Sequence, residues 1–204
     1  MKRAAIAGLA AGLAMTVGGA LGAVSKFNDV PSLKSDQSDQ LETANPLIAG
    51  QAMLSDRDIM ENMSASPLHT AFVKALKETG VAGALKTNGQ FTVFAPTNAA
   101  FAAEGSNSKS GLARRLSYLI VPGRYDSQAL LRAISEAGGD AKLRTAEGGT
   151  LVARMNGPTN IVVMDEKGNT ADIAIYDVHD KNGIVHVVDR VLEPGGSPRE
   201  LASN

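Results

Sequence analysis

The side chains that could bind a metal ion or transfer protons are few in this chain of 204 residues. Its only histidines are His69, His179 and His186, and it has no cysteine. His179 and His186 lie on either side of a turn, so paired strands could bring them together, but a zinc site needs at least a third protein ligand. Asp177 and Asp189 flank the same hairpin and are expected to bond turn amides, since no run of spaced carboxylates forms a calcium loop. The sequence predicts no metal site and no cofactor.

Nucleophilic catalysis also lacks a candidate group of residues. None of the serines considered for it, Ser64, Ser66, Ser117 and Ser127, stands in the Gly-x-Ser-x-Gly pattern of a nucleophile elbow. The sequence contains neither a phosphate-binding P-loop nor the glycine fingerprint of a dinucleotide-binding fold. We therefore expect a protein that is not an enzyme.

The composition excludes further classes. Lys and Arg number 20 against 21 Asp and Glu, and a net charge of -1 without a basic run gives no electrostatic basis for nucleic-acid binding. Aromatic residues make up 4% and Trp is absent, so aromatic stacking platforms are not expected. The absence of Cys excludes disulfides, thiolate metal sites and a lipidated N-terminal cysteine. The fold must therefore be stabilised by its core alone.

The first 22 residues have the pattern of a secretory signal peptide. Lys2 and Arg3 precede an uncharged stretch rich in Ala and Gly, and small residues at Ala20 and Gly22 favour cleavage after Gly22. Gly18-Gly19-Ala20 is the second candidate for cleavage, and an uncleaved membrane anchor is the alternative interpretation. Cleavage after Gly22 leaves 18 basic against 21 acidic residues, a net charge of -3. We expect a secreted or periplasmic, cell-envelope protein with no stable membrane span after cleavage.

The mature chain is expected to have three parts. Residues 23–51 are rich in Ser, Asp, Gln, Asn and Pro without a sustained period, which is typical of a flexible leader. Residues 52–195 carry the periodic patterns of a single folded domain, and residues 196–204 form a C-terminal tail.

Helical patterns come first within the domain. Ser66-Pro67 predicts a helix start that leads to a stop at Gly80. An apolar stripe that includes Leu119 and Ile120 predicts one helix over 111–121. The other helical segments are expected over 81–85, from Thr97 or Asn98 to 101, and from Asp126 or Ser127 to the glycines at 138–139.

Strand patterns follow the helices, and turns separate them. One strand is expected early, over 91–95, and the others over 142–145, 150–155, 161–164, 171–178 and 184–188. Because helices come first and a run of adjacent strands follows, the order favours an α+β fold over an alternating α/β fold.

Two blocks of sequence resemble the signature blocks of the fasciclin domain family. They are Phe91–Phe101 and Asn182–Pro194, and between them Leu116–Tyr125 resembles the family's central Tyr-His segment. The resemblance extends from about Asp58 to Pro194, and residues 155–160 together with 165–168 also resemble the single-domain exported bacterial members. It implies a fasciclin-like wedge of two β-sheets with several helices packed on one side. The family usually has His after the central Tyr, whereas Leu119 follows here, which puts any role of that His in doubt.

Five residues are candidates for binding or for a structural hydrogen-bond network: Thr97, Asn98, Tyr118, Asp177 and His186. His186 could belong to a recognition surface, but we favour a buried imidazole bonded to the backbone or to the first signature block. Asn98 is interpreted as a cap or turn residue, and Tyr118 as a buried ring with a bonded hydroxyl. The arginines at 114, 115 and 124 could form a small basic patch, although a solvated helix face is the favoured interpretation.

The resemblance also implies a function, that of extracellular adhesion or interaction modules with no established chemistry. Together with the signal peptide, it favours a non-catalytic interaction or adhesion module that binds a surface or matrix protein or a glycan. The alternative is a carrier of a small apolar ligand such as a carotenoid, because some fasciclin-like proteins carry carotenoids. Adaptable methionines would be available for such a ligand, including Met53, Met60, Met63, Met155 and Met164.

Overall fold

The computed structural model describes residues 45–86, 89–103 and 109–196. Seven of its strands form one sheet in the order β4-β3-β9-β8-β7-β6-β5. The strands are β3 (Phe91–Pro96), β4 (Ile120–Pro122), β5 (Asp140–Arg144), β6 (Thr150–Asn156), β7 (Asn160–Met164), β8 (Thr170–Asp180) and β9 (Gly183–Val188). All neighbours are antiparallel except β3 and β9, which are parallel.

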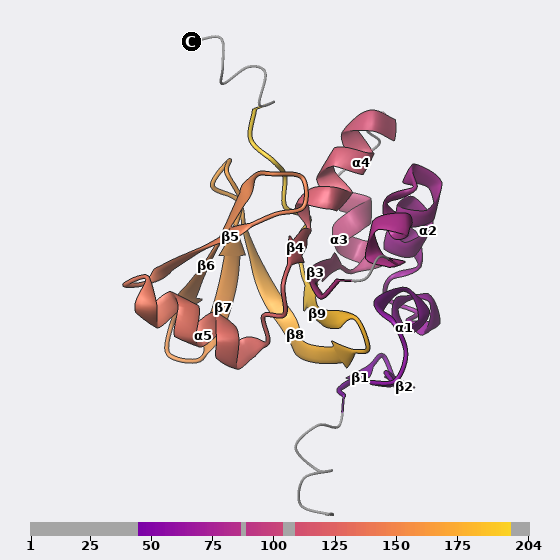
Figure 1. Ribbon diagram of the computed structural model, residues 1–204, viewed down its shortest axis with the longest axis horizontal. Helices are drawn as coiled ribbons and strands as arrows, with labels where there is room; N and C mark the ends of the chain where they lie inside the picture. Colours follow the sequence, from indigo (N-terminus) through magenta and orange to yellow (C-terminus); the bar gives the residue numbers. More distant parts are fainter. Residues whose placement is uncertain (1–44, 87–88, 104–108, 197–204) are drawn as a thin grey trace, which may run out of the picture.

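Strand β8 divides this order into two half-sheets. Its residues 170–172 pair with β7, whereas residues 173–180 pair with β9. The register shifts between Ile173 and Ile175 and again between Ile175 and Val178, and such irregularities bend a strand. The half-sheets β4-β3-β9 and β7-β6-β5 therefore diverge on either side of β8 (Figure 1).

Most helices lie on one side of the molecule, beside the half-sheet of β3, β4 and β9 (Figure 1). They are α1 (Ile59–Ala65), α2 (Thr70–Thr79), the 3-10 helix η1 (Val81–Lys86), α3 (Asn98–Ala103) and α4 (Lys109–Tyr118). Helix α5 (Ser127–Glu136) packs against β5 and β6 instead. The prediction of an α+β fold, and the family-derived expectation of a wedge with several helices on one side, are both confirmed, with α5 lying apart from the other helices. Among the residues that the structure describes, no helix is both long and apolar enough to cross a membrane.

The core lies between the helices and the half-sheet of β3 and β9. Strand β9 is buried at all of its positions, because it pairs with β3 on one edge and β8 on the other while α1 packs against it. Helix α2 contributes Phe72, Val73 and Leu76, which recur with helical spacing on one face. Edge strand β5 alternates exposed and buried positions, as expected of a strand with one solvated face.

Two boundary predictions were wrong. The helix expected to start at Ser66 begins at Thr70 instead. Ser66 is the C-cap of α1, a helix that the sequence patterns did not predict. The helix expected to continue through Val121 ends at Tyr118, because Ile120 enters β4 and pairs with Val93. Leu119 and Ile120 are both buried, but Leu119 lies in the turn after α4 and Ile120 in β4 rather than in a helix.

The part of the expected leader that the structure describes packs on the domain. Strands β1 (Leu47–Ile48) and β2 (Gln51–Ala52) form a small hairpin beside α1, in which Ile48 is fully buried (Figure 1). The side chain of Asn45 bonds both backbone groups of His179, each at 2.7 Å. The expected signal peptide over 1–22 and the tail from residue 197 lie outside the described residues.

Candidate functional site

His186 lies at the centre of a buried network between β8, β9 and the start of α5. Its Nε2 donates to the Tyr125 carbonyl at 2.8 Å, and its Nδ1 accepts from the Asp177 backbone N–H at 3.3 Å. The ring stacks on Phe94, with centroids 5.6 Å apart and planes inclined by 26°. Burial lowers the pKa of His186, so the imidazole is neutral at physiological pH.

Asp177 connects this network to helix α5. Its backbone has a φ of 57°, a left-handed conformation that Asp tolerates better than most residues. This turn of the chain directs its N–H at His186, while its carboxylate accepts from the backbone N–H of Ser127 at 2.7 Å and from the Ser127 hydroxyl. Asp126 caps α5 by accepting from the Ala129 N–H at 2.7 Å. Asp177 is therefore bonded to the first turn of α5 and not to turn amides of its own hairpin.

The network holds Ser, Asp and His, the residue types of a hydrolytic triad, but their hydrogen bonds have another order. In a triad the His accepts from the Ser hydroxyl and donates to the Asp carboxylate. Here the Ser127 hydroxyl donates directly to Asp177, and both nitrogens of His186 are bonded to backbone groups. The Ser127 hydroxyl therefore faces a carboxylate that the Ser127 N–H also binds, and no imidazole of this network faces it, so the arrangement joins β8 to the start of α5.

Thr97 and Asn98 lie in a separate network at the junction of β3, α3 and α2. The Thr97 hydroxyl accepts from the Ala100 N–H at 3.2 Å, as an N-cap of α3. The Asn98 side chain accepts from the Ala71 N–H at 2.9 Å and donates to the Pro67 carbonyl at 2.9 Å. Since the residue before α2, His69, makes no side-chain cap bond, Asn98 supplies the cap of α2 from another element.

Tyr118 lies in a third place, between α4 and the β-hairpins. Its ring is fully buried, and its hydroxyl donates to the Thr150 carbonyl at 2.6 Å and accepts from the Glu166 N–H at 3.1 Å. Burial raises the pKa of Tyr118, with neighbouring carboxylates acting in the same direction. A Cβ at Gly149 would lie only 2.8 Å from the Tyr118 ring, so this turn depends on glycine.

The three arginines do not form one basic patch. Arg114 pairs with Glu147 at 2.6 Å, and Arg115 pairs with Glu193 at 2.6 Å. Arg124 lies elsewhere, with bonds to the Asp180 carbonyl and to His179 Nδ1. The favoured prediction of a solvated helix face was also wrong for Arg115, whose side chain is only 12% exposed.

Two buried polar groups that the sequence patterns did not point to lie where α1 meets the last hairpin. Asp180 is 2% exposed; one carboxylate oxygen accepts from the Asn62 amide, and the other has no hydrogen-bond partner within the described residues. Burial raises the pKa of Asp180 to about 7. The Asn62 side chain also donates a hydrogen bond to the Leu54 carbonyl at 2.7 Å and accepts one from the Leu54 N–H at 3.0 Å.

Helix α1, which carries Asn62, had one signal in the sequence. Asp58 and Glu61 have the spacing of a capping box, and they form that box at the start of α1.

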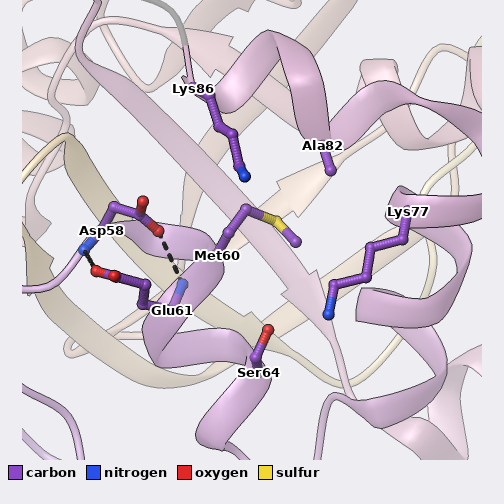
Figure 2. A pocket seen from close by; sticks show the side chains of 7 residues that line it. All are labelled: Asp58, Met60, Glu61, Ser64, Lys77, Ala82 and Lys86. Carbon is purple, nitrogen blue, oxygen red and sulfur yellow. Dashed lines mark hydrogen bonds between the residues drawn. The ribbon is translucent and has the colours of Figure 1, made fainter.

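Two adjoining depressions of the described surface lie along the outer helices, away from all five predicted residues. One of about 340 Å³ is lined by Asp58, Met60, Glu61, Ser64, Lys77, Ala82 and Lys86, from α1, α2 and η1 (Figure 2). A second of about 310 Å³ shares Ser64 and Lys77 and is also lined by Thr70, Val73, Lys74 and Glu78. We call these adjoining depressions the α1–α2 groove. Within the described residues, no three His, Asp or Glu side chains converge as metal ligands.

The five predicted residues thus fall into three places. Asp177 and His186 are brought together, Thr97 and Asn98 form the α2–α3 junction, and Tyr118 stands apart from both. Each uses its polar atoms on backbone groups of neighbouring elements. None of the five lines the α1–α2 groove.

Comparisons with known proteins agree with this architecture. A family model described as the Fasciclin domain matches residues 67–194. Protein sll1483 of Synechocystis is 28% identical over 167 residues, which cover 76% of this chain and 84% of that protein. Human periostin is 25% identical over 150 residues, 70% of this chain but only 17% of periostin. The solved FAS1 domain pair of the insect cell adhesion molecule fasciclin I matches with a TM-score of 0.59 and 18% identity, over 67% of this chain and 50% of that one.

Proposed function

Because the chain belongs to the fasciclin domain family, we propose that it is a non-catalytic interaction module that acts outside the cytoplasm, in the periplasm, at the cell surface or in the matrix. Its partner is a surface or matrix protein or a glycan. One structural relative, fasciclin I, is a cell adhesion molecule. The signal-peptide pattern of residues 1–22 supports export.

One observation carries the proposal: the polar groups most able to do chemistry hold the fold together. His186 has both nitrogens bonded to backbone groups, and the Asp177 carboxylate is bonded to Ser127 at the start of α5. The residues of this network thus lack the His-to-Ser hydrogen bond by which a hydrolytic triad activates its nucleophile, which supports a module without catalysis.

The test is fractionation of the native host, followed by chemical cross-linking and co-purification of the tagged full chain from the fraction that contains it. We expect one reproducible partner from the envelope or the medium, and a strain without the protein should adhere less. Wild-type adhesion without any cross-linked partner would contradict the proposal.

The second candidate function is a carrier of a small apolar ligand such as a carotenoid. Met60 favours it, because this residue lines the depression shown in Figure 2. Against it, Met53, Met60 and Met63 are at most 6% exposed and belong to the core. An absorbance scan of the protein purified from its host decides the matter, since a carrier would arrive coloured or would shift the spectrum of added carotenoid.

A further inference from the structure

We propose that Asn156 is a site of spontaneous deamidation, whereas Asn182, which stands in the same Asn-Gly sequence, is protected by the fold. The inference goes beyond the proposed function, because it concerns a covalent change that needs only water. A glycine has no side chain to shield its nitrogen or to restrict its backbone, so that nitrogen reaches the amide of a preceding asparagine easily. A third such pair, at 88–89, begins at a residue outside the described ranges.

The reaction involves one dipeptide and one molecule of water. The Gly157 nitrogen attacks the side-chain carbon Cγ of Asn156, and the new N–Cγ bond closes a five-membered succinimide. The side-chain nitrogen leaves as ammonia and takes the proton that the Gly157 nitrogen loses. Water then adds to either carbonyl of the ring and breaks its bond to the ring nitrogen, which gives aspartate or isoaspartate. An amide is thus replaced by a carboxyl group, which is ionised at neutral pH.

The Asn156–Gly157 pair has the freedom that ring closure requires. Asn156 ends β6 and Gly157 opens the turn over 157–159, and both residues are exposed. Among the described residues, neither the Asn156 side chain nor the Gly157 N–H has a hydrogen-bond partner. Gly157 has a φ of 78°, and an added Cβ there would meet nothing within 4 Å. The amide carbon and the attacking nitrogen can therefore approach each other without losing a bond of their own.

Asn182 is held by bonds on both sides of its amide. Its Oδ1 accepts from the Ile59 N–H at 2.9 Å, and its Nδ2 donates to the Leu85 carbonyl at 2.7 Å. Its backbone carbonyl accepts from the Phe91 N–H at 3.1 Å. The next residue, Gly183, is buried at the start of β9, where an added Cβ would lie 2.0 Å from the Phe91 carbonyl oxygen. Ring closure at 182 therefore requires α1, η1 and β3 to separate from the last hairpin first.

Deamidation would place a new carboxylate at the tip of the β6–β7 hairpin, in the half-sheet that lies away from α1–α4 (Figure 1). Asn156 is paired with Asn160, whose amide donates to Asp172. Arg154 stands two positions earlier on the same face of β6 and bonds Asp140 at 2.9 Å. The aspartate product thus enters a surface of mixed charge and should fold normally. Isoaspartate adds one carbon to the backbone and should disturb the pairing of β6 with β7.

The test incubates the full chain in mildly alkaline buffer, once folded and once in guanidinium chloride, and follows both sites by mass spectrometry. Trypsin separates them, because Asn156 lies on peptide 155–167 and Asn182 on peptide 182–190. In the folded protein, we expect Asn156 to deamidate at least about tenfold faster than Asn182, because reaction at 182 must wait for local opening. In guanidinium chloride the two rates should become similar, because both sites have the same dipeptide.

Two references assign the reaction to this position. Asn156→Gln, whose longer side chain cannot form a five-membered ring, should abolish the mass gain of peptide 155–167. Asn160 in the same peptide is followed by Ile161 and should stay unmodified. Asn156→Asp supplies the charge without isoaspartate, and its melting temperature should match that of the unmodified protein.

Three results would overturn the proposal. The first is an Asn156 that stays intact in the folded protein while it reacts in guanidinium chloride. The second is equal reaction of Asn156 and Asn182 in the folded protein, and the third is a mass gain that persists in Asn156→Gln.

Discussion

At the scale of single residues, the interior polar groups differ in how completely they are bonded. Both nitrogens of His186 have backbone partners, whereas Asp180 keeps one buried carboxylate oxygen without a partner among the described residues. His69 lies 2.7 Å from the Ser66 hydroxyl, and burial lowers its pKa to about 4. Each of these buried groups makes the stability depend on pH, because burial shifts its folded pKa away from the unfolded value.

We predict that His186→Ala destabilises the protein by about 3 kcal/mol, because it removes the stacking on Phe94 and leaves the Tyr125 carbonyl and the Asp177 N–H unpaired. For a domain of this size, that is a fall in Tm of roughly 6–12 °C. Thermal melting measures it, with His179→Ala as the milder control, since among the described residues that half-buried ring bonds only Arg124. An unchanged Tm together with lost partner binding would instead assign His186 to a recognition surface.

Asp180 should make the protein less stable as the pH rises from about 4 to about 7. The unfolded chain loses this proton near the ordinary aspartate pKa of 3.8, whereas the folded chain keeps it to about pH 7, so the unfolded state binds fewer protons in that interval. The stability that this group contributes is therefore greatest below about pH 4 and is lost as the pH rises through 7. In Asp180→Asn, the free energy of unfolding should therefore fall by roughly 2–4 kcal/mol less over this pH range than in the wild type.

Chemical denaturation at pH 4.5 and pH 8 measures the effect of Asp180. Between pH 4.5 and pH 8, the free energy of unfolding should fall less in Asp180→Asn than in the wild type. Asp56→Asn, at an exposed position, should show the same fall as the wild type. If the two variants behave alike, the Asp180 carboxyl is not the buried acid that the contacts indicate.

At the scale of elements, the fold depends on how closely parallel strands β3 and β9 approach at their starts. Gly183 opens β9 beside the carbonyl of Phe91, and an added Cβ would overlap that carbonyl oxygen and lie 2.9 Å from the Ile59 side chain. Because the obstacle is backbone in a central strand, it cannot move aside as a flexible side chain would.

Gly183→Ala should therefore cost about 3 kcal/mol or more, through displacement of β9 from β3 and of α1 from both. The matched control is Gly83→Ala in η1, where an added Cβ meets nothing within 4 Å, and its stability should change by less than about 0.5 kcal/mol. Urea denaturation of both variants tests this, and similar midpoints would refute the requirement for glycine at 183.

At the scale of the whole molecule, the N-terminal hairpin, α1 and the last β-hairpin form one packed unit. Ile48 enters the core, Asn45 bonds the outer edge of β8 at His179, and Asn182 bonds both the Ile59 N–H and the Leu85 carbonyl. Segments more than a hundred positions apart in the chain thus meet at one corner of the domain (Figure 1).

We predict that Ile48→Ala lowers the global stability by about 2–4 kcal/mol, as expected of a fully buried residue of the cooperative core. Leu47→Ala, at a neighbouring side chain that is 63% exposed, should cost far less. Hydrogen exchange combined with calorimetry separates the possibilities, because local fraying of β1 and β2 without a fall in Tm would place the hairpin outside the cooperative unit.

Much of the fold was predictable because local sequence patterns specify its strands and turns. Alternation of apolar residues indicated the strands of the second half, and glycine pairs marked the turns between them. The capping box of Asp58 and Glu61 was readable in the same way, although α1 was not predicted from it. The end of α4 could not be predicted from the sequence, because Ile120 is apolar in either conformation and only its pairing with Val93 makes it part of a strand.

The sequence by itself determined the family, through its two blocks, and the α+β order of elements, through the change of period along the chain. Only the tertiary structure decided which polar groups meet: Asn98 caps a helix 27 positions earlier, Asp177 bonds Ser127 across 50 positions, and Lys77 and Lys86 flank Met60. Local periodicity specifies which face of an element is buried. It carries no information on which distant backbone group will lie opposite a given side chain, because packing of the assembled core sets that distance.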